Sequence, residues 1–179
     1  NRLHRVECRR SDPGFKRINM ATENRKPFIV WFKDLTIEDV GIVGGKNAAL
    51  GEMFSNLAPM GIQIPNGFAI TAEAYRYFLK QSGIDDKIKE ALKGLDTRDI
   101  RNLQVRGRKV RKLILRAKIP EDLKDEISKA YRELGKIYRR DPDVAVRSSA
   151  TAEDLPGASF AGQQETYLNI VGAKSVLEA

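Results

Sequence analysis

The sequence predicts an α+β fold in which short strands alternate with amphipathic helices. Four short runs have the apolar, β-branched and aromatic composition of strands, at residues 28–32, 68–70, 144–146 and 166–170. The segments between them carry apolar residues at helical spacing, punctuated by glycine and proline. We expect a single domain over residues 27–179.

The first strand and the first helix are separated by a loop. Phe28–Phe32 is a continuous apolar run, typical of a strand buried on both faces. A glycine pair at residues 44 and 45 then opens a helix, whose apolar residues recur at helical spacing as far as Leu57. Pro59-Met60-Gly61 is expected to end it.

The second strand leads directly into another helix. Thr71 is expected to be the N-cap of that helix, which stops at Gly83. A short helix over residues 85–93 follows. The next predicted helix covers residues 100–117, and its apolar stripe implies that it packs on a core.

The last third of the chain repeats this alternation. Pro120 suits the first turn of a helix that ends before Asp141-Pro142, because a residue preceding proline avoids the helical region. The third and fourth strands come next, separated by a loop rich in small residues. Val176 and Leu177 are predicted to begin a further helix.

Positive charge is concentrated in two segments. The 179 residues include 32 Lys and Arg and 24 Asp and Glu, a formal net charge of +8. Residues 1–26 and 98–118 carry the basic excess, so the rest of the chain is mildly acidic. Residues 1–26 show no apolar period, which predicts a disordered or peripheral basic tail.

Several classes of protein are disfavoured by composition. The longest run of large apolar residues is far shorter than the roughly 20 that a membrane helix needs, so we expect no membrane association. Cys8 is the only thiol, which excludes an internal disulfide and favours the cytoplasm. His4 is the only imidazole and lies in the tail, so we expect no catalytic triad or phosphohistidine within the chain.

Gly44-Gly45-Lys46 is the first candidate anion site. Adjacent glycines allow close approach of backbone amides, and a lysine in the first helical turn supplies a cation for phosphate oxygens. The segment is not a Walker A loop, because Val40 and Asn47 stand where glycine and Ser or Thr belong. The alternative is a tight turn with a solvated lysine.

Arg147 is the second candidate, at the end of a strand and before a loop of small residues. Its guanidinium can clamp two phosphate oxygens. The alternative is an ion pair with Glu153 or Asp154. The glycines, hydroxyls and amides of residues 157–163 suit a segment that folds over a ligand.

The basic stretch 98–118 favours another class of protein, a nucleic-acid-binding module. It contains no aromatic residue for base stacking, so a solvated outer face is the preferred interpretation and nucleic acid is an unlikely partner.

Three segments resemble signatures of the phosphoenolpyruvate synthase (pyruvate, water dikinase) family. They are VGGKNAALGEM at 43–53, IPNGFAIT at 64–71 and VRSSATAEDLPGASFAGQQETYLN at 146–169. Rifampin phosphotransferases and pyruvate phosphate dikinases, which share parts of these signatures, are the alternatives. The first signature's continuation favours the synthase.

The resemblance implies an incomplete ATP-grasp-like nucleotide-binding domain, with a small mixed sheet and flanking helices. Its ATP-binding residues map to Lys46, Arg147, Gly162 and Thr166, with Gly44, Gly45 and Gln163 as further candidates. The implied parent enzyme serves gluconeogenesis and converts ATP, pyruvate and water to AMP, phosphoenolpyruvate and phosphate. It does so through a phosphohistidine on another domain.

The same resemblance predicts an amino-terminal fragment of a longer chain. The carrier histidine, the Mg²⁺ ligands and the pyruvate site are expected downstream of residue 179. We therefore expect no catalytic residue and no metal ligand within these residues, and no activity from the chain alone.

Overall fold

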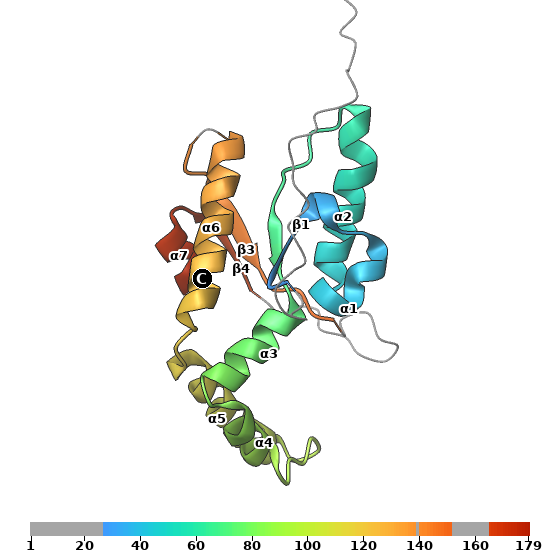
Figure 1. Ribbon diagram of the computed structural model, residues 1–179. Helices are drawn as coiled ribbons and strands as arrows, with labels where there is room; N and C mark the ends of the chain where they lie inside the picture. Colours follow the sequence, from blue (N-terminus) through green and yellow to red (C-terminus); the bar gives the residue numbers. More distant parts are fainter. Residues whose placement is uncertain (1–26, 139, 152–164) are drawn as a thin grey trace, which may run out of the picture.

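A computed structural model describes residues 27–138, 140–151 and 165–179, in which helices flank short strands (Figure 1). The strands are β1 Ile29–Trp31, β2 Phe68–Ile70, β3 Val144–Arg147 and β4 Thr166–Ile170. The helices are α1 Val40–Val43, α2 Gly45–Leu57, α3 Ala72–Gln81, α4 Asp85–Leu92, α5 Ile100–Arg116, α6 Glu121–Tyr138 and α7 Ala173–Glu178. Short 3₁₀ turns cover Phe32–Asp34, Ile37–Asp39 and Ala58–Met60. In these ranges no helix combines the length and apolar composition needed to cross a membrane.

The β1–β2 pair lies between two apolar clusters. The strands are antiparallel, with Val30 opposite Ala69 and Trp31 opposite Phe68. Val30 and Ala69 pack on the α1–α2 side, in a cluster completed by Leu35, Val43 and Ala48. The opposite cluster contains Phe28, Phe68, Ala74, Leu123 and Ile127, which join the pair to α3 and α6. Both faces of β1 are therefore covered, although its residues are only half-buried because the sheet has two strands.

The predicted single mixed sheet is wrong for the described residues. They form two separate two-stranded sheets, both antiparallel. In the second, Val144 pairs with Ile170, while Val146 pairs with Tyr167 across an irregularity in register. Asn169 lies in that irregularity with a φ of 58°, a left-handed conformation that asparagine tolerates. Arg147 does not end a buried strand as expected, because β3 alternates between half-buried and exposed residues.

Most element predictions are confirmed, and the differences have local causes. Thr71 caps α3 as expected: its hydroxyl accepts from Ala74 N at 3.2 Å and donates to Pro27 O at 2.9 Å. The segment expected to be a loop after β1 instead contains α1 and two 3₁₀ turns, one of them closed by a capping box between Thr36 and Asp39. Helix α6 begins at Glu121, one residue after Pro120.

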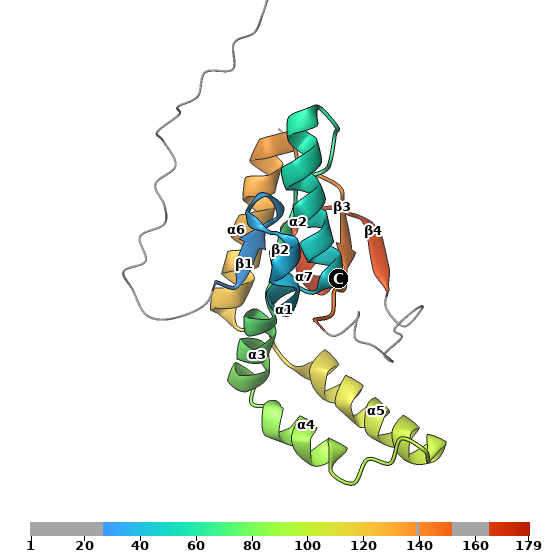
Figure 2. The ribbon, with the colours of Figure 1, turned by 90° about the vertical axis from the view of Figure 1, so that its right-hand side faces the viewer.

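Helices α4 and α5 form an arm that projects from the strands, as Figures 1 and 2 both show. All of α5 is described, yet none of its residues is buried, and Leu115 is 84 % exposed. The expectation that α5 packs on a core is therefore wrong, since α5 lies against α4 instead. Arg106 ties the two helices together by donating to Ala91 O at 2.8 Å.

Tyr131 links α6 to both strands of the β3–β4 pair at one end of that pair, just before β3 and just after β4. Tyr131 is only 2 % exposed. Its hydroxyl donates to Pro142 O and accepts from Gly172 N, each at 2.8 Å. Tyr131→Phe is expected to lower the free energy of unfolding by about 1–3 kcal/mol, because it leaves buried polar groups without these partners. Urea unfolding measures the change. Tyr75→Phe, at an exposed position of α3, is the control, and an equal loss there would contradict the structural role of the Tyr131 hydroxyl.

Candidate functional site

The start of α2 packs against the segment that follows β3. Gly44 precedes α2 with φ 81° and ψ 159°, a conformation nearly confined to glycine. A Cβ atom on Gly44 would lie 2.3 Å from Ser149 Oγ and 2.8 Å from Ala150 O. The missing side chain therefore lets the two segments that carry Lys46 and Arg147 approach closely, although they are about a hundred positions apart in sequence.

Backbone amides in the first turn of α2 point toward this segment. Gly45 N donates to Ala150 O and Asn47 N donates to Ser149 Oγ, each at the long distance of 3.4 Å. The Asn47 side chain donates to Val43 O at 2.9 Å, which joins α1 to α2. Gly44 and Gly45 thus have a packing role within the chain, and contact between them and ATP stays a prediction.

Thr166 lies beside Arg147 in the second sheet. The two residues are directly paired in the antiparallel register, at the end of β3 from which the Ser148–Ala150 segment leaves. Both are exposed, whereas Lys46 is half-buried. The fold therefore gathers the segments of three sequence-predicted residues, Lys46, Arg147 and Thr166, at one end of the β3–β4 pair.

Two predicted ATP-binding residues, Gly162 and Gln163, lie outside the described residues. Glu153 and Asp154, the alternative partners of Arg147, do so as well. The structure adds Ser149 and Asn47 to the candidate site, since they join its two halves. Sequence reasoning missed them because neither residue carries a charge. A signal was present in the small residues after Arg147, which suit close packing against a glycine.

A phenol and a carboxylate flank Thr166. The Tyr167 hydroxyl donates to Glu165 Oε2 at 2.8 Å, and this hydrogen bond raises the pKa of Tyr167 above its ordinary value. Tyr167 therefore keeps its proton at neutral pH. Nowhere do the described residues bring three or more His, Cys, Asp or Glu side chains together in a group that could hold a metal ion.

Comparison with known proteins identifies the family. The family model described as pyruvate phosphate dikinase, AMP/ATP-binding domain, matches residues 40–179, which include both halves of the candidate site. The chain belongs to this family. The match leaves out β1 and begins with α1.

Relatives named phosphoenolpyruvate synthase are similar to most of this chain. The synthase of Aquifex aeolicus is 53 % identical over 161 residues, covering 89 % of this chain and 19 % of the relative. That of Helicobacter pylori is 53 % identical over 151 residues, covering 84 % and 19 %. That of Synechocystis is 50 % identical over 156 residues, also covering 84 % and 19 %. The predicted resemblance is confirmed, and the chain spans about a fifth of the length of these relatives.

Proposed function

We propose that this chain binds ATP at the junction of α2 and the β3–β4 pair. Lys46 and Arg147 hold the phosphate oxygens, and Thr166 lies beside Arg147 to contact the nucleotide. The observation that carries the proposal is the packing of Gly44 on Ser149 and Ala150, because it joins the two cation-bearing segments. Two cations and the amino end of a 13-residue helix favour an anionic ligand.

The reaction proposed for the whole protein is that of phosphoenolpyruvate synthase, in which ATP, pyruvate and water give AMP, phosphoenolpyruvate and phosphate. The relatives' names support it. Residues 27–179 would form the amino-terminal part of an ATP-grasp domain, Gly162 and Gln163 would complete its nucleotide contacts, and a phosphohistidine elsewhere would accept the phosphoryl group. Lys46 and Arg147 would stabilise charge on the phosphate oxygens during transfer.

Magnesium would accompany ATP in this reaction, but the described residues do not fit a metal site, since they bring no suitable ligand group together. We therefore assign no magnesium ligand within the described residues. The proposed role of its residues is to bind and orient the polyphosphate. The proposed pathway is gluconeogenesis and the proposed compartment is the cytoplasm.

Lys46→Ala is expected to weaken ATP binding by about 10- to 150-fold, the equivalent of losing a hydrogen bond to a charged group. Binding of adenosine is expected to change little, because the ammonium group meets phosphate and not the base. Isothermal titration calorimetry of the 179-residue chain with each ligand measures both.

Lys80→Ala is the matched control, since Lys80 is an exposed lysine in the last turn of α3, away from the site. If the Lys46 variant, the Lys80 variant and the unaltered chain bind ATP with equal affinity, Lys46 is not part of the ATP site.

A further inference from the structure

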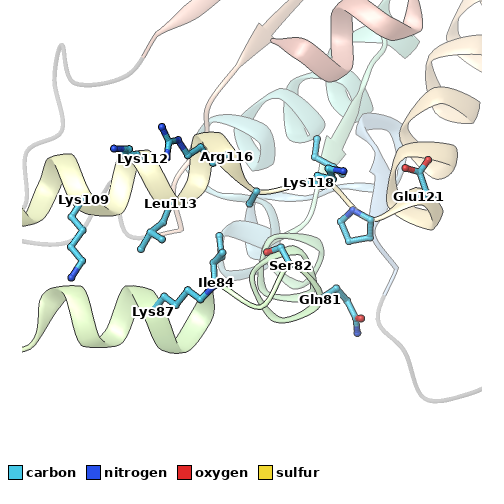
Figure 3. A pocket seen from close by; sticks show the side chains of 13 residues that line it. Gln81, Ser82, Ile84, Lys87, Lys109, Lys112, Leu113, Arg116, Lys118 and Glu121 are labelled. Atoms are coloured by element: carbon cyan, nitrogen blue, oxygen red, sulfur yellow. The ribbon is translucent and has the colours of Figure 1, made fainter.

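An open groove lies where α3, α4, α5 and the start of α6 meet, on elements other than those of the proposed ATP site. Its volume is about 820 Å³, within the roughly 300–1,000 Å³ typical of small-molecule sites. Figure 3 shows Leu113 and Lys109 reaching from α5 toward α4, which carries Lys87 and is directly preceded by Ile84. The groove therefore combines apolar and cationic side chains from two facing helices.

Five cations line this groove, against one carboxylate. They come from α4, from α5 and from the turn before α6: Lys87, Lys109, Lys112, Arg116 and Lys118. None of them forms an ion pair with any residue in the described ranges. Their mutual repulsion destabilises the arm unless a ligand offsets it.

Lysines elsewhere on α4 and on α6 form ion pairs with carboxylates of their own helix. Lys89 on α4 pairs with Asp85 at 2.7 Å, and Lys136 on α6 pairs with Glu133 at 2.6 Å. Helix α5 has no acidic residue that could do the same. The structure also separates the α5 cations by role, because Arg106 is engaged with Ala91 O, whereas the groove-lining cations are exposed.

We propose that this groove binds a small anion that carries two or more phosphate groups on an apolar carbon skeleton. Two or three phosphates would match the charge of the five cations. The half-buried side chains of Leu113 and Ile119 would cover the carbon skeleton, since Ile84 is only 5 % exposed. The ligand is a second one, distinct from the ATP held at the α2–β3 junction.

The described residues that line the groove argue against a nucleic acid as its ligand. They include no aromatic side chain on which a base could stack. Glu121 is the one carboxylate in the lining and pairs with Lys124 at 2.7 Å, so that part of the groove offers no free cation to a phosphate backbone that continued past Lys118. A short ligand confined to the cationic part of the groove avoids this carboxylate.

Binding is tested with tripolyphosphate, in the 179-residue chain carrying Lys46→Ala and Arg147→Ala so that the proposed ATP site is weakened. Calorimetry at low salt is expected to detect binding. Adding Lys87→Glu and Lys109→Glu is expected to lower that affinity by about tenfold or more, because it reverses two of the five charges that line the groove, one on α4 and one on α5. Adding Lys129→Glu and Arg132→Glu instead makes the same charge change at two exposed positions of α6 and is expected to change the affinity little.

The control separates site binding from a general effect of net charge. Equal losses in the two charge-reversal variants would overturn the proposal, as would the absence of tripolyphosphate binding. If charge reversal at Lys87 and Lys109 unfolds the chain by circular dichroism, Lys87→Gln with Lys109→Gln replaces it. Because the ATP-site cations are absent in every arm, this experiment can fail while the proposed ATP site stands, and the reverse also holds.

A second comparison tests the apolar part of the groove. Methyl diphosphate and hexyl diphosphate carry the same charge and differ by five CH₂ groups. Hexyl diphosphate is expected to bind about tenfold more tightly, which corresponds to burial of about two CH₂ groups. Equal affinities would refute the apolar skeleton, and tighter binding of a single-stranded oligonucleotide than of either probe would replace the small anion with a nucleic acid.

Discussion

Gly44→Ala is expected to lower the free energy of unfolding by about 2–6 kcal/mol and to abolish ATP binding. Two effects add. The backbone at Gly44, with φ 81° and ψ 159°, costs about 1–3 kcal/mol for a residue with a Cβ atom. The added methyl group would also lie 2.3 Å from Ser149 Oγ and 2.8 Å from Ala150 O, and such overpacking costs about 1–3 kcal/mol. Urea unfolding and calorimetric titration with ATP measure the two consequences.

The neighbouring Gly41 provides the matched control. It lies within α1, and apart from its chain neighbours and the backbone of its own helix no atom lies within 4 Å of the position that its Cβ atom would take. Gly41→Ala is expected to leave stability equal or slightly higher, because alanine has the better helix propensity. The double variant Gly44→Ala/Ser149→Gly removes the overlap of the new methyl group with Ser149 Oγ but keeps its overlap with Ala150 O. This variant should therefore recover only part of the lost stability. A Gly44→Ala chain as stable as the Gly41→Ala chain would contradict the close packing of α2 on the segment after β3.

Local signals made much of the secondary structure predictable. Thr71 has a side chain suited to an N-cap, and the helix after it has apolar residues at regular spacing, so α3 followed from neighbouring residues alone. The pairing of the strands was harder to predict, because the paired residues are distant in sequence. Val30 meets Ala69 and Arg147 meets Thr166, and these pairings make two sheets in place of the expected mixed one.

The candidate site was predictable residue by residue, but its assembly was not. The sequence marks Lys46 and Arg147 as candidate phosphate-binding residues because each cation adjoins glycine or small residues. Their chain segments meet only because Gly44 admits Ser149 and Ala150, a contact between distant segments that no local pattern contains. The opposite error arose at α5, where a periodic apolar stripe suggested a core. Helix α5 instead lies against α4, with no residue buried, and contributes Leu113 to an open groove.

Arg147→Lys is expected to lower the activity of a full-length synthase carrying this segment by about 10- to 150-fold while leaving its fold intact. Lysine keeps the charge but loses the planar fork that binds two phosphate oxygens at once. The loss corresponds to a hydrogen bond to a charged group. Arg147 is exposed at the end of β3, so a residue of similar length is accommodated without repacking a core. Pyruvate-dependent formation of AMP measures the activity.

The same substitution separates a phosphate clamp from a surface ion pair. If Arg147 served only to pair with Glu153 or Asp154, lysine would replace it at a cost of about 0–1 kcal/mol in stability and catalysis would be unchanged. Arg132→Lys, at an exposed position of α6, is the control for an arginine outside the proposed site, and it is expected to retain full activity. The 179-residue chain alone is expected to form no AMP. Full activity of the Arg147→Lys enzyme would remove Arg147 from the ATP site, because charge without fork geometry would then suffice.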